Sequence, residues 1–212
     1  MTGRRVTGKI AAGLFFGLLA AWPAGAAAQT LCFCPLCLTG EQRMYRTVAG
    51  AMLPGQAEGG CIFAKAGNEG VRPGSVVAFR GAGGIEYIFR VVATGGQRIA
   101  MKAGIPVIDG QPVRRERLGE MELSLRDAGP GQICEGAACR VDRWRETLAT
   151  GASYEILQGP GPGPLDDMAE LTVPPGHLFV MGDNRGNSND SRSPFGGPGM
   201  VALDDVTGVF PD

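Results

Sequence analysis

The stretch Gly182–Arg192 reads GDNRGNSNDSR and contains no apolar side chain. It follows the short apolar run Leu178–Met181, which is entered through Val173-Pro174-Pro175-Gly176. An apolar run of this length, bounded by Pro and Gly, predicts a strand, a sharp turn and then a polar loop. Because Asp, Asn and Ser bond nearby backbone amides and Arg forks onto carboxylates, we expect a loop of one conformation lying outside the core.

A solvated surface loop is the plain alternative for a segment of this composition. The segment Val173–Arg192, however, resembles the last signature box of the type I signal peptidases, VPxGxxFxMGDNRxxSxDSR. Within the loop the matching residues are Gly182, Asp183, Asn184, Arg185, Ser188, Asp190, Ser191 and Arg192. The resemblance implies a mainly β, antiparallel signal-peptidase-like fold. It also implies that Ser188 faces a catalytic lysine amine and that Asp190 and Arg192 form a pair that braces the loop.

Two earlier boxes of the same family align with this chain, and both lack their reactive residue. The segment like PSGSMxPT corresponds to Val48–Gly55, where Ala51 stands at the position of the serine nucleophile. Ala49 replaces an upstream serine that, in family members that have it, helps to stabilise the oxyanion. The pattern YIKRVVGxPGDxI resembles Tyr87–Ile99, and Phe89 stands at the position of the lysine base.

These replacements predict a cleft without hydrolytic chemistry. An alanine has no oxygen to attack a carbonyl, and a phenylalanine ring has no lone pair to accept a proton. We therefore expect a pseudoenzyme that binds signal peptides or other extended segments of exported preproteins, or that regulates an active peptidase. One alternative is an active peptidase with a relocated dyad, for which Ser75 and Thr47 are candidate nucleophiles. Another is a cysteine-based redox or structural module.

The N-terminus has the pattern of an export segment. Arg4, Arg5 and Lys9 precede and enter an apolar run from Ile10 to Trp22, and small residues follow up to Ala28. This predicts a cleaved signal peptide at residues 1–28, with an uncleaved membrane anchor as the alternative. Residues 29–212 would then form the exported body, in the periplasm or at the periplasmic face of the cytoplasmic membrane.

Short apolar runs separated by glycine-rich turns fill the central part of the body. We expect strands at 61–65, 75–80, 85–93, 98–102 and 106–108. The spacer QGPGPGP at Gln158–Pro164 cannot continue a strand ladder. We expect it to close a smaller inserted β subdomain at about 104–171.

Six cysteines lie in the exported body, where an oxidising compartment favours disulfides. Cys134 and Cys139 enclose a short loop and are the best candidate pair, and some signal peptidases resemble this in carrying a local disulfide in the same insert. The cluster Cys32, Cys34 and Cys37 is compatible with structural disulfides, a redox couple or a metal site, and structural disulfides are favoured.

Charge and histidine content exclude several other classes. The whole chain has a formal net charge of −1, and removal of residues 1–28 would take away three basic side chains and no acid. A body with this acidic balance has no basic field for nucleic acid. A single histidine, His177, gives no imidazole cluster for a metal, so we expect neither a metal nor another cofactor.

Overall fold

The computed structural model describes residues 32–47, 49–56, 59–129 and 132–211. These residues form three antiparallel sheets and four short 3-10 helices. The mainly β, antiparallel fold predicted from the sequence is therefore confirmed. The predicted signal peptide or anchor at residues 1–28 lies outside the described residues. In the described ranges no helix has the length and apolarity needed to cross a membrane.

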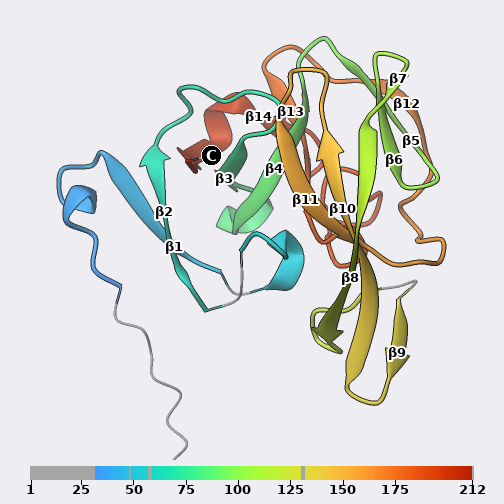
Figure 1. Cartoon of the computed structure of the whole chain (residues 1–212). Helices are drawn as coiled ribbons and strands as arrows, with labels where there is room; N and C mark the ends of the chain where they lie inside the picture. The colour runs from blue at the N-terminus through green and yellow to red at the C-terminus, as the bar shows by residue number, and fades with distance from the viewer. Residues whose placement is uncertain (1–31, 48, 57–58, 130–131, 212) are drawn as a thin grey trace, which may run out of the picture.

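The largest sheet has seven strands and joins both ends of the described chain (Figure 1). Its strands in spatial order are β1 (Gln42–Arg46), β2 (Cys61–Ala66), β15 (Val206–Val209), β3 (Val76–Arg80), β4 (Glu86–Thr94), β13 (His177–Met181) and β14 (Val201–Ala202). The C-terminal strand β15 lies between β2 and β3, so the sheet cannot be completed until the end of the chain is present.

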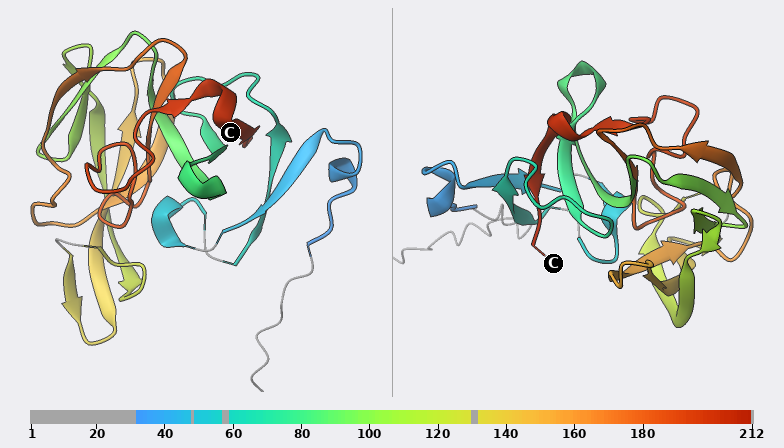
Figure 2. Two further views of the ribbon diagram at one scale, coloured as in Figure 1. Left: turned by 180° about the vertical axis from the view of Figure 1, so that it is seen from behind. Right: turned by 90° about the horizontal axis from the view of Figure 1, so that it is seen from above.

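Two four-stranded sheets occupy the sequence between β4 and β13. One contains β8 (Arg114–Ser124), β9 (Ile133–Glu135), β10 (Ala138–Thr147) and β11 (Ser153–Gln158). The other contains β5 (Arg98–Lys102), β6 (Ile105–Ile108), β7 (Gln111–Pro112) and β12 (Met168–Thr172). Both lie to one side of the seven-stranded sheet, as the three views agree (Figures 1 and 2).

The observed strands follow the predicted runs to within about one residue at either end. The Pro/Gly spacer falls between β11, which ends at Gln158, and β12, which begins at Met168. The sheet of β5, β6, β7 and β12 begins at Arg98 and ends at Thr172, so it extends beyond the predicted insert at about 104–171 on both sides. We propose that the two sheets together are the inserted subdomain.

The core is built on both faces of β4, which contributes residues to two apolar clusters. Val91 packs into one apolar cluster with Phe79, while Val92 packs into another with Phe179 and Ile156. Because both faces of this central strand are covered, its sequence is an unbroken apolar run where it crosses the core. The cluster that contains Val91 also contains Phe89, which places the predicted base position at the core boundary.

Candidate functional site

Ala51 lies in a tight 3-10 turn that the polar loop holds directly. The turn, η2 (Gly50–Met52), follows Ala49 in extended conformation. The backbone N–H of Asn184 donates to the Ala51 carbonyl oxygen at 2.9 Å. The Asn184 side-chain amide donates to the Gly50 carbonyl oxygen at 3.1 Å. The structure therefore brings the predicted nucleophile position and the Gly182–Arg192 loop together, although Gly182 lies 131 positions after Ala51 in the sequence.

Ser188 lies at the same turn and is bonded to main-chain atoms. Its hydroxyl lies 2.9 Å from the Asn184 carbonyl oxygen and 3.2 Å from the Ala51 carbonyl oxygen, so its one proton is shared between two acceptors. Gly182 makes this approach possible, because a Cβ atom there would overlap the Ser188 hydroxyl. The hydrogen bond to a lysine amine that the family resemblance implied for Ser188 is replaced by these two contacts.

Phe89 is part of an aromatic cluster rather than a polar group facing a cleft. Its side chain is buried on β4, with ring centroids 6.0 Å from Tyr87 and 6.1 Å from Phe79. Met52, from the η2 turn, belongs to the same apolar cluster. The predicted base position is thus filled by a ring whose burial stabilises the fold, where a lysine amine would require desolvation.

The expectation that the polar loop lies outside the core is wrong. Asp183, Asn184, Arg185, Asp190 and Arg192 are all buried, and Asn184 and Asp190 have no exposed surface. A buried charge is tolerated when a partner and further hydrogen bonds replace its water. The loop meets that condition through its own side chains and through residues that sequence reasoning did not place near it.

Within the loop, Asp190 and Arg192 form a closed pair. The guanidinium donates to the two carboxylate oxygens at 2.9 and 2.7 Å and to the Arg185 carbonyl oxygen at 3.0 Å. Asp190 also accepts from the Gly182 backbone N–H at 2.9 Å. The Ser191 hydroxyl accepts from Val180 N–H and donates to a downstream carbonyl oxygen, so the loop is tied back to β13.

Asp183 pairs with Arg90, the neighbour of Phe89 on β4. Nε and Nη2 of Arg90 donate to the two carboxylate oxygens at 2.8 and 2.7 Å. Burial raises the pKa of the Asp183 carboxyl, and the hydrogen bonds from Arg90 oppose that rise. The guanidinium also lies 4.2 Å from the centroid of the Tyr154 ring. Tyr154 belongs to β11, so the sheet of β8 to β11 packs against the same ion pair.

Arg185 is bound by Glu146 of β10, which has no exposed surface. Two hydrogen bonds of 2.9 and 2.5 Å join the guanidinium to the carboxylate, and Arg115 of β8 adds a third at 2.5 Å. Burial alone would raise the pKa of Glu146, but the charges of Arg185 and Arg115 outweigh it and hold that pKa below its usual range. The sheet of β8 to β11 therefore holds the polar loop through the cluster of Arg115, Glu146 and Arg185.

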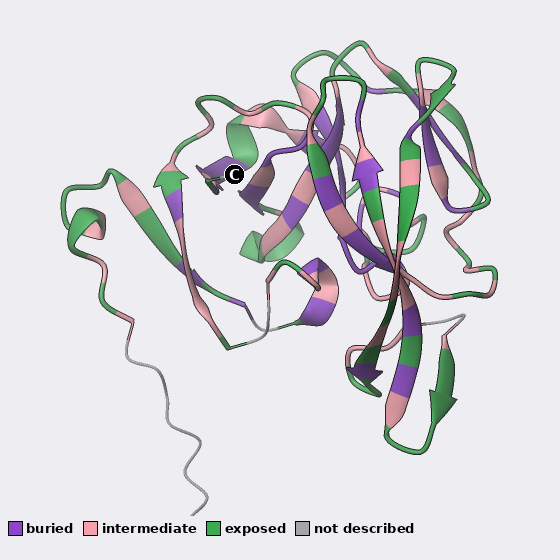
Figure 3. Ribbon diagram, viewed as in Figure 1, coloured by how far each residue is buried: buried purple, intermediate pink, exposed green. Residues whose placement is uncertain are grey.

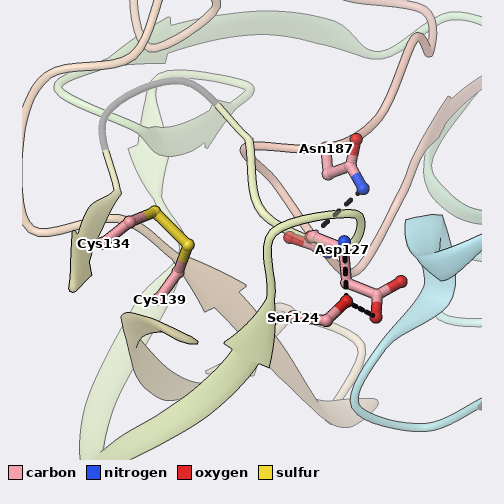
Figure 4. Close-up of a disulfide and its surroundings, with 6 residues drawn as sticks. Ser124, Asp127, Cys134, Cys139 and Asn187 are labelled. Carbon is pink, nitrogen blue, oxygen red and sulfur yellow. Dashed lines mark hydrogen bonds between the residues drawn. A yellow bond between two sulfur atoms is a disulfide. The ribbon is translucent and has the colours of Figure 1, made fainter. Parts of the chain in front are cut away.

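A loop of the inserted sheet also reaches the Ala51 turn (Figure 4). Asn184 and Asn187 donate to the Asp127 carbonyl oxygen at 2.8 and 3.1 Å. A Cβ atom on Gly50 would overlap the Asp127 carboxylate, so a larger residue there would require the Asp127 side chain to move. The Cys134–Cys139 disulfide links β9 to β10 beyond this loop, at directly paired positions.

The alternative catalytic residues lie elsewhere. Ser75 and Thr47 are buried, and the Ser75 hydroxyl accepts from the Arg72 N–H. Lys65 lies on β2 and pairs with Glu69, whereas Lys102 is exposed at the end of β5 in another sheet. His177 begins β13, and its Nδ1 bonds the Pro175 carbonyl oxygen at 3.0 Å. None of these serine, threonine, lysine and histidine residues lies on η2 or at position 89.

The six cysteines form three disulfides: Cys32–Cys61, Cys34–Cys37 and Cys134–Cys139. Among the described residues, no group of three or more His, Cys, Asp or Glu side chains is arranged to hold a metal ion. The cysteine cluster Cys32, Cys34 and Cys37 thus forms two disulfides. Cys34 bonds Cys37 within the cluster, and Cys32 bonds Cys61 of β2.

The family model described as "Signal peptidase, peptidase S26" matches residues 26–211, and the chain belongs to this family. The signal peptidase I of Pseudomonas aeruginosa is 31% identical over 142 residues, which is 66% of this chain. The chain spans 44% of the length of that relative.

A solved signal peptidase I from Enterococcus faecalis is 20% identical, with a TM-score of 0.37. The matched region covers 68% of this chain and 98% of that chain.

Sequence reasoning did not assign roles to the partners of the loop, namely Arg90, Glu146, Arg115 and Asp127. Arg90 carried a usable signal: on a strand whose neighbour Phe89 faces the core, an arginine turned to the opposite face needs a buried partner. Glu146 stands in a segment that resembles a family stretch, but nothing in its spacing indicates contact with Arg185. Asp127 acts through its backbone carbonyl, which leaves no trace in the sequence.

Proposed function

We propose that this chain is a signal peptidase family member that binds extended segments of exported preproteins without cleaving them. The observation that carries the proposal is the pair Ala51 and Phe89, which stand at the two positions where the family resemblance places the catalytic serine and lysine, beside an intact Gly182–Arg192 loop. The body would act outside the cytoplasm, at the periplasmic face of the membrane or in the periplasm, where the preproteins processed by this family emerge.

The lack of hydrolysis follows from the chemistry of the two positions. Peptide cleavage of this type needs an oxygen nucleophile and a neutral base within hydrogen-bond reach of it. Ala51 presents a methyl group, and the Phe89 ring is enclosed by Phe79 and Tyr87. Ser188, which is the nearest hydroxyl to the turn in the loop, is held by the carbonyl oxygens of Ala51 and Asn184.

Peptide binding is supported by an open strand edge beside the Ala51 turn. On one side β3 pairs with β4 along Glu86–Arg90, but on the other side β13 pairs only with Arg90–Thr94. In the described ranges no strand pairs with Glu86–Phe89 on that second side. Because the main-chain groups of Val91 bond Gly74 and Ser75 on the β3 side, those of Ile88 point to the open side. An extended peptide can add there as a strand.

The decisive experiment incubates the purified chain with a preprotein that carries an Ala-x-Ala cleavage site. We expect saturable binding and no cleavage product. Cleavage at the Ala-x-Ala site by the unaltered chain would refute the inactive assignment, and absence of binding would refute the peptide-binding half of the proposal.

The matched variants restore the missing chemistry stepwise. We expect Ala51→Ser combined with Phe89→Lys to cleave the bound preprotein, whereas Ala51→Ser alone remains inactive because no base accompanies the new hydroxyl. Activity of the single variant would show that another residue supplies the base.

A further inference from the structure

The segment that precedes β1 carries a second chemical feature, the disulfide between Cys34 and Cys37. We propose that this disulfide is a thiol-exchange site that oxidises a dithiol in an extended, apolar segment of another polypeptide. The site is separate from Ala51 and goes beyond peptide binding at the β4 edge. Four observations carry the inference: the small loop that the disulfide closes, the anchoring of its segment, the exposed apolar residues around it and the surface hollow onto which it opens.

First, this bond contributes less to the stability of the fold than the Cys32–Cys61 bond does. It joins residues only three positions apart in the sequence, so it removes little conformational freedom from the unfolded chain. The 3-10 helix between its cysteines, η1 (Pro35–Cys37), contains no buried residue. The bond can therefore open while the body stays folded, as the exchange requires.

Second, an independent bond keeps the segment in place. Cys32, just upstream, is joined to Cys61 at the start of β2. Opening the Cys34–Cys37 bond would leave that connection intact. The pair therefore sits on a fixed platform, at the outer strand of the seven-stranded sheet (Figure 1).

Third, apolar side chains surround the pair without being covered. Phe33 and Leu38 are 80% and 88% exposed, and Leu36 and Met44 are each 45% exposed. Figure 3 shows the whole η1 segment as exposed or intermediate surface. Exposed apolar groups beside a reactive disulfide match a substrate that is itself apolar and unfolded, because burial of apolar surface holds the two chains together during exchange.

Fourth, the pair faces an open hollow of about 420 Å³ with opposite charges at its wall. Cys34 and Cys37 both line it, together with Arg43 and Tyr45 of β1 and Glu86 of β4. A thiolate must leave when the disulfide is attacked, and a nearby guanidinium such as that of Arg43 favours the thiolate, whereas Glu86 opposes it. Among the described residues β1 is the outermost strand of its sheet and pairs with β2 alone, so its other edge can accept an extended chain.

The reaction is balanced without any further reagent. A thiolate of the substrate attacks one sulfur of the Cys34–Cys37 bond, a mixed disulfide forms, and the other cysteine leaves as a thiolate. The second substrate thiol then attacks the mixed disulfide. The substrate gains a disulfide and loses two protons and two electrons, and Cys34 and Cys37 become two thiols.

The other two disulfides provide internal controls. Cys139 is fully buried and faces Cys134 across paired strands, so reduction there would leave an enclosed thiol. Cys32–Cys61 spans 29 positions and anchors the segment. Exchange at the proposed site should therefore reach Cys34 and Cys37 before the other four cysteines.

The test mixes the oxidised full chain with one equivalent of a reduced apolar peptide that contains two cysteines. New thiols are then alkylated and located by mass spectrometry. We expect label at Cys34 and Cys37 only. In Cys34→Ser and in Cys37→Ser the remaining cysteine is a free thiol, so these variants are mixed with the peptide in its disulfide form and quenched with acid. The remaining thiolate should attack the peptide disulfide and be trapped as a mixed disulfide, with the second peptide sulfur leaving as a thiolate. Equal labelling of all three pairs, or no trapped species in either variant, would overturn the proposal.

A matched variant separates peptide recognition from simple reducibility. Leu36→Ser with Leu38→Ser removes exposed apolar surface only, so folding should be unchanged by circular dichroism. We expect exchange with the apolar peptide to slow by roughly tenfold, because apolar contact with both leucines is lost, while the rate with dithiothreitol stays the same. A rate with the apolar peptide that is unchanged, or that falls in parallel with the dithiothreitol rate, would contradict recognition by these side chains.

Discussion

Single residues explain how a loop without one apolar side chain comes to lie inside the protein. Asp183, Arg185, Asp190 and Arg192 each face a partner of opposite charge at hydrogen-bond distance. Removal of one member would leave the other charge buried without compensation, which costs more than the intact pair contributes. Glycine is equally constrained at Gly182, because the main chain there passes against both the Ser188 hydroxyl and the Ala51 carbonyl.

Gly182→Ala is expected to destabilise the fold by about 1–3 kcal/mol, the usual cost of forcing an extra carbon into a packed site. The added Cβ would displace Ser188 and with it the contact to Ala51. Urea unfolding followed by intrinsic fluorescence measures the change. Gly55→Ala is the control, because a Cβ at that nearby position meets its nearest atom at 3.8 Å. Equal effects of the two variants would contradict this account.

At the scale of elements, Glu146 connects β8 and β10 to the polar loop Gly182–Arg192. This carboxylate lies on β10, receives Arg115 from β8 and binds Arg185 of the polar loop, so it connects the inserted sheet to the segment that holds Ala51. The inserted strands thus help to shape the site even though they contribute none of the aligned catalytic positions.

Glu146→Gln is expected to lower the free energy of unfolding by about 3–5 kcal/mol near neutral pH, since two guanidinium groups lose their common partner. The pKa of Glu146 is lowered in the folded protein from the ordinary value of 4.5. Its stabilising contribution is therefore complete above that value and is lost as the pH falls below it. The difference between the variant and the unaltered chain should shrink in acid unfolding curves.

Glu155→Gln provides the comparison on the same sheet. Glu155 forms ion pairs of 3.3 Å with Arg143 and 3.7 Å with Arg145, and its side chain is 38% exposed where that of Glu146 is fully buried, so the change is expected to be at most about 1 kcal/mol. A pH-independent effect of Glu146→Gln would show that its carboxylate is not ionised in the folded protein.

At the scale of the whole molecule, the large sheet contains strands from both ends of the described chain. β15 lies between β2 and β3, and the Cys32–Cys61 bond attaches the segment before β1 to the start of β2. This bond closes a much longer loop than Cys34–Cys37 and should therefore contribute more to stability in the chain-entropy model.

Replacement of both Cys32 and Cys61 by serine is expected to lower the free energy of unfolding by about 3–4 kcal/mol, compared with about 2 kcal/mol for Cys34→Ser with Cys37→Ser. Denaturant unfolding under non-reducing conditions compares the two double variants. A larger loss of unfolding free energy from Cys34→Ser with Cys37→Ser would show that the local bond is structural. It would also argue against opening of the Cys34–Cys37 bond in thiol exchange.

The sequence by itself determined the family, the antiparallel β class and the positions of the main strands, and it predicted that Ala51 and Phe89 stand at the serine and lysine positions. These depend on local patterns and on motif residues that keep their order along the chain. Tertiary structure alone decided that the polar loop is buried and that Ser188 bonds the main chain. It also brought Arg90, Glu146 and Asp127 to the loop. The physical reason is that a charged side chain is stable in the interior only beside partners from distant strands, and chain folding alone determines which strands meet.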